Sequence, residues 1–224
     1  MKKYFILTAF CIFTLPLFAE ADIFKVAPGA EEQLSQLLNK PAMVTPAVVT
    51  PLGRNWFKME TDAHVFTDQV SVKQVTAALL DIENYNKIFD GKRTKITTSV
   101  VQRAPEETIV DFVTIAIVPV VNIRLNTPYR ASVKTLTQTD TVYSTDIRQL
   151  PKDSETNGKI KQMYAPRYVE EVTINGKKYT YIRMYSIMDT DASILPGAKG
   201  TLEKNAGPTS EEAIELLIAG AKTK

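Results

Sequence analysis

Short runs of apolar, β-branched and aromatic residues, separated by turn residues, recur along most of the chain and predict a β-rich protein. The pair Asn175-Gly176 marks the clearest turn, because both positions of a two-residue hairpin favour residues that tolerate a positive φ. Short connections between successive strands favour one antiparallel sheet. The seven expected strands span residues 56–66, 95–103, 108–118, 121–136, 141–150, 160–174 and 179–189.

Two helical segments accompany the strands. The first begins at Ser71, a favourable N-cap, and places the apolar residues up to Leu80 on one helix face; residues 81–89 continue it as a second short helix or an irregular turn. The second spans residues 208–222, after a loop at residues 197–207, and begins with acidic residues that suit the positive end of a helix dipole. Its apolar stripe consists of Ala213, Ile214, Leu217, Ile218 and Ala221.

Residues 22–54 are expected to form an arm in front of the main domain, which we place at residues 55–224. Residues 29–40 of this arm have the apolar spacing of a short amphipathic helix, with leucines on one face. Three prolines then favour an extended connection, because each fixes its own φ and biases the preceding residue away from helix. The apolar helix face either packs on the protein's own sheet or binds another protein.

The first 21 residues have the order of an export signal. Lys2 and Lys3 precede an apolar run at residues 4–18, and Ala19-Glu20-Ala21 is a small-x-small cleavage site, so residues 1–21 are expected to be removed. The sequence thus predicts an exported protein, periplasmic or secreted. The first alternative is a retained anchor, although the run is shorter than the roughly 20 apolar residues of a spanning helix. The second is a lipoprotein modified at Cys11.

Composition narrows the chemistry available to the chain. Of its 224 residues, 44% are hydrophobic and 23% charged, which is typical of a globular protein. The 27 Lys+Arg and 25 Asp+Glu give a net charge of +2. This charge is small for a protein that binds the phosphate backbone of a nucleic acid, so we expect no nucleic-acid partner. One histidine, His64, and one cysteine, Cys11, cannot build a zinc cluster or a disulfide framework. We therefore expect no metal and no cofactor.

A sheet that curls around the last helix would enclose a cavity, and strand alternation indicates which side chains face it. We expect one face of residues 108–118 and one face of residues 179–189 to line this cavity with the apolar stripe of the helix. Methionines suit both an irregular core and a pocket for variable apolar ligands. The candidate ligand-binding residues are Val110, Phe112, Thr114, Ala116, Ile182, Met184, Ser186, Met188, Ile214 and Leu217.

Two segments carry a resemblance to a known superfamily. In residues 71–89, a leucine-bearing helix leads into Asp81, Tyr85 and Phe89, and this resembles the helical segment of the START and Bet v 1-like superfamily. Residues 189–196 are similar to the turn that leads from the last strand of START domains into their C-terminal helix. Together with the order of the elements, the resemblance covers residues 55–222.

The resemblance implies an α+β helix-grip fold, with a curved seven-stranded antiparallel sheet around a C-terminal helix and a helical pair after the first strand. Such a fold encloses a cavity for a lipid, a sterol or another apolar molecule. The sequence therefore predicts an exported, monomeric START-like protein without enzymatic activity. We expect it to bind, or to bind and transfer, a lipid or hydrophobic small molecule and to contact a membrane transiently.

Two alternatives remain open at this point. The first is a cyclase-like enzyme of the same superfamily, whose general base would be His64, Asp111 or Asp146, although spacing fixes no partner for any of them. For His64 we instead expect a strand residue whose ring lies at the surface or in a satisfied hydrogen bond. The second alternative is a protein-interaction module that uses the arm of residues 22–54 for recognition.

Overall fold

The structure is a computed structural model that describes residues 23–118, 123–150 and 160–224. The expected export signal, with Cys11 and the cleavage site, lies outside these residues. Within the described ranges, no helix combines the length and the apolar character that crossing a membrane requires. The same ranges contain no group of three or more His, Cys, Asp or Glu side chains that could hold a metal ion.

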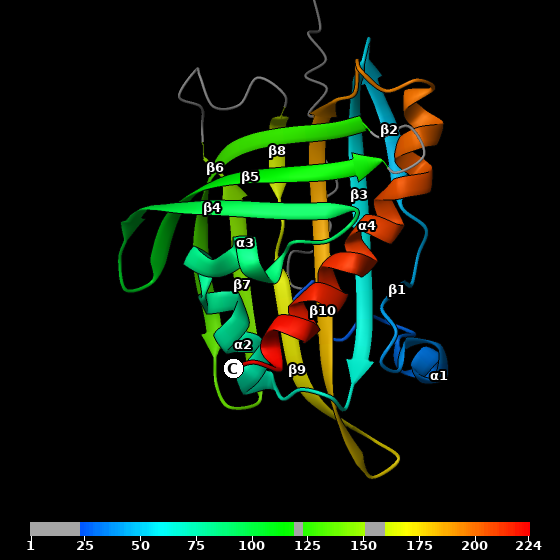
Figure 1. Ribbon diagram of the computed structural model, residues 1–224. Coiled ribbons are helices and arrows are strands. Elements are labelled where there is room, and N and C mark those ends of the chain that lie inside the picture. Colours follow the sequence, from blue (N-terminus) through cyan, green and yellow to red (C-terminus); the bar gives the residue numbers. More distant parts are fainter. Residues whose placement is uncertain (1–22, 119–122, 151–159) are drawn as a thin grey trace, which may run out of the picture.

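A large antiparallel sheet forms the body of the protein (Figure 1). Its ten strands in the described residues are β1 (Ala42–Met43), β2 (Val48–Gly53), β3 (Trp56–Thr67), β4 (Thr94–Arg103), β5 (Glu107–Val118), β6 (Ile123–Gln138), β7 (Val142–Gln149), β8 (Ile160–Tyr164), β9 (Arg167–Ile174) and β10 (Lys177–Asp191). They follow the order β1-β3-β10-β8-β7-β6-β5-β4, while β2 pairs with β3, and β9 pairs with both β10 and β7.

The expected count of seven strands is wrong for two reasons. First, the arm contributes β1 and β2, which both pair antiparallel with β3, so the expected extended connection is extended but is also part of the sheet. Second, the single strand expected at residues 160–174 is two strands, β8 and β9, separated by Ala165 and Pro166. Proline has no N–H to donate to a strand ladder, which explains a break at this position.

Two local predictions are confirmed by the backbone. Ser71 caps the following helix in a capping box: its hydroxyl accepts from the Gln74 N–H at 3.3 Å, and the Gln74 side chain accepts from the Ser71 N–H at 3.0 Å. Asn175 and Gly176 have φ values of 51° and 77° and connect β9 to β10 as a two-residue hairpin. Both features depend only on residues that are neighbours in the chain.

The helices are short except for the last. They are the 3₁₀ segments η2 (Glu31–Gln33) and η3 (Ile82–Asn84) and the α-helices α1 (Leu34–Leu37), α2 (Val72–Leu80), α3 (Tyr85–Ile88) and α4 (Ala198–Ala221). Figure 1 shows α4 crossing β3 and β10 diagonally, with α2 and α3 beside its C-terminal end. In the same view β4, β5 and β6 run across the direction of β3 and β10, so the sheet is strongly curved. This arrangement confirms an α+β fold with a C-terminal helix.

The loop expected at residues 197–207 is wrong from Ala198 onward, because α4 begins there and continues through Pro208. Proline removes one intrahelical hydrogen bond and normally ends or bends a helix. Here both halves of the helix bury apolar side chains: Leu202 packs with Phe57 and Leu195, and the stripe that starts at Ala213 packs into the main core. Tertiary packing therefore outweighs the local signal of the proline.

The arm covers the other side of the sheet. Its expected helix is shorter than residues 29–40 and consists of η2 and α1. Leu37 is fully buried against Phe66 and Tyr181, and Leu34 and Leu38 pack around the same cluster. The apolar face of the arm thus packs on the protein's own sheet. The interaction-module alternative loses the exposed apolar face on which it depended.

Candidate ligand cavity

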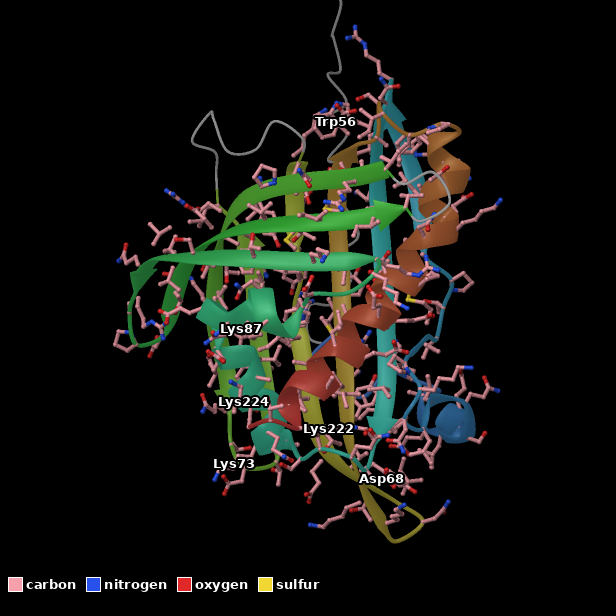
Figure 2. The ribbon with its side chains drawn as sticks, in the orientation of Figure 1. Trp56, Asp68, Lys73, Lys87, Lys222 and Lys224 are labelled. Carbon is pink, nitrogen blue, oxygen red and sulfur yellow. The ribbon has the colours of Figure 1, made fainter. Side chains whose placement is uncertain are left out.

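A cavity of about 170 Å³ lies between the curved sheet and α4. Side chains from β3, β4, β5, β6, β8, β9, β10 and α4 line it, and most of the lining is apolar. Thr190, one of the lining residues, pairs across the strands with Phe57, next to Trp56. Figure 2 labels Trp56 at one end of the molecule and Lys222 and Lys224 toward the other, so the cavity reaches into the Trp56 end.

The size of the cavity suits a small or medium-sized molecule. The volume of about 170 Å³ is the space open to the centre of a water molecule, of which one water needs about 10–15 Å³. The cavity therefore has room for on the order of ten waters, which occupy roughly 300 Å³ in the liquid. This is the lower end of the range of about 300–1,000 Å³ that ligand pockets occupy. The apolar part of the wall comes chiefly from Met59, Ile96, Ala116, Leu125, Met163 and Met184. Several of these are methionines, whose flexible side chains adapt to different ligand shapes.

The ten candidate residues divide into two groups of five. Those in the first group line the cavity and are Thr114, Ala116, Met184, Ser186 and Met188. Those in the second group are buried in the main core instead and are Val110, Phe112, Ile182, Ile214 and Leu217. The strands β5 and β10 extend beyond the cavity, so one part of their inward face lines the cavity and another part packs in the core. A role in ligand binding stays a prediction for all ten.

Aromatic rings fill the interior next to the cavity. Phe112 of the core group stacks on Tyr129 of the lining, with ring centroids 5.1 Å apart and an interplanar angle of 7°. The centroid of the Tyr85 ring lies 6.5 Å from that of Phe112 and 5.0 Å from that of Phe89. The segment that carries Tyr85 and Phe89 is one of the two on which the superfamily resemblance rests. Its aromatic residues pack the core beside the cavity rather than the cavity itself.

The helix α4 provides the largest single part of the lining, and none of its lining residues is among the ten candidates. Thr201, Leu202, Asn205, Ala206, Thr209, Ser210 and Ala213 face the cavity. Most of them fall in the segment that was expected to be a loop. A signal was present, because Leu202, Ala206, Thr209 and Ala213 recur at intervals of three and four residues, which is a helical period. Gly207 and Pro208 obscured it.

Hydroxyl groups make the wall polar in places. Ser210 of α4 donates its hydroxyl hydrogen to the Thr61 hydroxyl of β3 at 3.1 Å, which joins the helix to the sheet across the cavity. Thr127 donates to the carbonyl oxygen of Thr114 at 2.7 Å. Such bonds offset the cost of removing hydroxyls from water. The cavity can therefore accept a ligand that is mainly apolar but carries polar groups.

Of the side chains that the structure describes, Arg167 is the one charged group that lines the cavity. It begins β9, directly after the break at Pro166, and is partly buried. Burial lowers the pKa of its guanidinium, because the charged form is removed from water. Nothing in the sequence singled out this residue among the arginines of the chain.

None of the three residues considered as a general base lines the cavity. His64 is fully buried on the side of the sheet that the arm covers, where its Nδ1 lies 2.6 Å from the Tyr181 hydroxyl. That hydroxyl also accepts from the Ala27 N–H at 3.1 Å. The expectation of a hydrogen-bonded strand histidine is confirmed. Asp111 forms an ion pair with Arg130, and Asp146 forms one with Arg148; in each the arginine Nε lies 2.7 Å from a carboxylate oxygen.

No model of a protein family matches the chain, and no curated protein matches it. Solved structures do match. The STAR-related lipid transfer protein from Xanthomonas axonopodis is 8% identical, with a TM-score of 0.52, and the match covers 80% of this chain and 99% of that one. Human StAR-related lipid transfer protein 5 is also 8% identical, with a TM-score of 0.51 and coverage of 80% and 88%. These likenesses show that the chain has a START-like fold.

Proposed function

We propose that the protein binds a lipid or another largely apolar small molecule in the cavity beneath α4. The observation that carries the proposal is the cavity of about 170 Å³, whose wall is mostly apolar. Burial of apolar ligand surface in a preformed pocket contributes about 25 cal/mol per Å² before the entropic cost of binding. The names of the two matched structures, both lipid transfer proteins, support the same class of ligand.

We place the route of ligand entry beside α4, because the helix supplies a large part of the wall. The hydrogen bond between Ser210 and Thr61 holds this part of α4 to β3. Pro208 lies two residues before Ser210 and weakens the helix ladder there. We therefore propose that the segment of α4 on the N-terminal side of Ser210 opens to admit the ligand.

The proposal extends to where and how the protein works. The order of residues 1–21 supports export to the periplasm or the exterior. In that setting the protein would act as a monomer that carries its ligand and contacts a membrane transiently to exchange it. No catalytic step belongs to the proposal, because the three candidate bases lie outside the cavity.

Cavity filling tests the proposal. Ala116 lines the cavity, and Ala116→Phe would place a ring in the space that the ligand needs. Ala219→Phe adds the same ring at an exposed position of α4 and is the matched control. We expect the delipidated wild type and the Ala219→Phe variant to bind a fluorescent apolar probe, and Ala116→Phe to bind it at least about tenfold more weakly, a loss of roughly 1.4 kcal/mol.

Native mass spectrometry of the protein from its own source provides the second measurement. The expected result is a retained small molecule that is lost on delipidation. Failure of the delipidated protein to take up apolar probes of any chain length, together with purification free of any small molecule, would reject the proposed function.

A further inference from the structure

Within residues 23–118, 123–150 and 160–224, the Arg167 guanidinium is fixed to the cavity wall through its Nη1 nitrogen. Its Nη1 donates to the carbonyl oxygens of Ala165, Pro166 and Tyr185, at 3.1, 3.0 and 3.0 Å. Two of these carbonyls belong to the break between β8 and β9, and the third belongs to β10. The break in the sheet thus holds a cation at the edge of an apolar cavity.

The opposite edge of the same guanidinium has no hydrogen-bond partner among the described residues. Neither Nε nor Nη2 of Arg167 donates a hydrogen bond to any of the residues that the structure describes. Arg167 lines the cavity, and neither nitrogen is among the side-chain atoms of the described residues that are buried without a partner. We infer that this edge is open to a molecule in the cavity. An arginine presents Nε and Nη2 as a fork that matches two carboxylate or phosphate oxygens.

Two other arginines show how this chain completes such an edge. Arg183 donates from Nη1 to the carbonyl oxygens of Ile23 and Lys25, while its Nε and Nη2 bind the two carboxylate oxygens of Asp62 at 2.9 and 2.6 Å. Arg130 binds Asp111 through the same two nitrogens at 2.7 and 2.8 Å. Arg167 repeats the carbonyl contacts of Arg183 but has no carboxylate.

The charge balance of the cavity points the same way. Among the described residues, the lining contains no aspartate, glutamate, lysine or histidine, so these residues give it a net charge of +1 through Arg167. Although burial lowers the pKa of this group, an arginine guanidinium stays protonated in proteins. An unpaired charge in apolar surroundings is costly, and a bound anion would relieve that cost. Tyr129, whose pKa burial raises to about 12, also lines the cavity and remains a neutral hydrogen-bond donor.

We propose that the cavity binds an amphipathic anion, whose carboxylate or phosphate oxygens pair with Nε and Nη2 of Arg167 while its apolar body lies along the methionines. This inference rests on the proposed function and specifies the class of its ligand. A long-chain carboxylic acid or an alkyl phosphate has this chemistry. A neutral molecule of the same length leaves the guanidinium edge unpaired.

Matched ligands test the inference. Dodecanoate, dodecyl phosphate and 1-dodecanol share one chain and differ in the head group, and each can displace a neutral fluorescent probe from the delipidated protein. We expect at least one anion to bind about tenfold more tightly than 1-dodecanol, since hydrogen bonds to charged groups contribute about 1.5–3 kcal/mol. The tighter of the two anions identifies the head group as carboxylate or phosphate.

Arg167→Met removes the charge and keeps an apolar side chain of similar length. We expect it to abolish the preference for the anion and to leave the affinity for 1-dodecanol within about twofold of the wild type, since the apolar contacts are unchanged. The matched control is Arg103→Met, because Arg103 is an exposed strand arginine that pairs with Glu83. This variant should retain the full preference.

The outcomes separate the inference from the proposed function. Equal affinities of the wild type for the anions and 1-dodecanol overturn the inference and leave apolar binding in place. Displacement of the neutral probe by none of the three ligands also overturns the inference, whereas failure of the neutral probe itself to bind overturns both. If Arg167→Met does not fold, the wild-type preference still decides, because it requires no variant.

Discussion

Glu212 of α4 accepts a hydrogen bond from the backbone N–H of Arg93 at 2.7 Å, across 119 residues of chain. The same carboxylate accepts from the N–H groups of Lys92 at 3.0 Å and Thr94 at 2.8 Å. It therefore fixes the helix over the cavity to the start of β4. Gly91 fits beside it because a Cβ there would lie 2.5 Å from Glu212 Oε2. The attachment lies on the C-terminal side of Ser210, outside the segment of α4 that we propose opens to admit the ligand.

Removal of this carboxylate should destabilise the protein. Glu212→Ala leaves three backbone donors without their partner, and we expect a loss of about 2 kcal/mol in the free energy of unfolding. Urea denaturation measures the change. Glu215→Ala, at an exposed position of the same helix, should change stability by less than about 0.5 kcal/mol. Equal effects of the two variants would contradict the role given to Glu212.

Two glycines of α4 should respond to alanine with opposite signs. A Cβ at Gly200 meets nothing within 4 Å, so Gly200→Ala should stabilise the helix by up to about 1 kcal/mol. A Cβ at Gly220 would lie 2.9 Å from Ile88 Cγ2 in the core, so Gly220→Ala should cost about 1–3 kcal/mol. Thermal unfolding followed by circular dichroism distinguishes the signs. A stabilised Gly220→Ala variant would show that the contact between α4 and α3 is looser than described.

The pair of Asp62 and Arg183 should make stability depend on pH in the acid range. Burial acts to raise the pKa of Asp62, but hydrogen bonds from His64 and Arg183 outweigh it and hold the pKa below its ordinary value. A carboxyl with a lowered pKa in the folded state contributes stability above the unfolded pKa of about 3.9 and loses it as the pH falls further.

Asp62→Asn should therefore be less stable than the wild type by about 3 kcal/mol at pH 7, because it leaves Arg183 without its carboxylate. The difference should shrink as the pH falls below about 4, where the wild-type carboxyl also becomes protonated. Urea denaturation at a series of pH values measures it. Asp140→Asn, at an exposed turn position, is the control and should show no such trend. A difference that is the same at pH 3 and pH 7 would refute the linkage.

Pro208 should control the exchange of ligand rather than its affinity. Pro208→Ala restores a donor for the helix ladder, and we expect slower amide hydrogen exchange around residues 204–212 and slower release of a bound apolar probe. Ser210→Ala removes the bond to Thr61 and should speed release. Stopped-flow displacement compares the two variants with the wild type. Identical release rates in all three proteins would show that the ligand leaves by another route.

Local signals in the sequence were sufficient for some elements. The cap at Ser71 and the hairpin at Asn175-Gly176 depend on side chains and φ preferences within a few residues, and both appear as expected. The inward faces of β5 and β10 follow from the alternation of strands. Alternation alone did not show where the cavity ends, so Thr114 and Met184 line it while Val110 and Ile182, on the same faces, pack in the core.

Other features could not be predicted because their causes are distant in sequence. Pro208 locally signals a helix break, but contacts of Leu202 and Ile214 with opposite ends of the sheet keep α4 continuous. The strands β1 and β2 exist because β3 offers them an unpaired edge. Proline spacing in the arm carries no information about that edge.

By itself, the amino-acid sequence determined the cap at Ser71, the turn at Asn175-Gly176 and the apolar faces of β5 and β10, because each of these depends on residues that are close in the chain. The tertiary structure alone decided that a hollow remains beneath α4 and that, among the described side chains, one cation lines it. Arg167 acquires its position from carbonyl groups at residues 165, 166 and 185. Only folding brings these three carbonyl groups together, because two lie in the break between β8 and β9 and the third lies in the neighbouring strand β10.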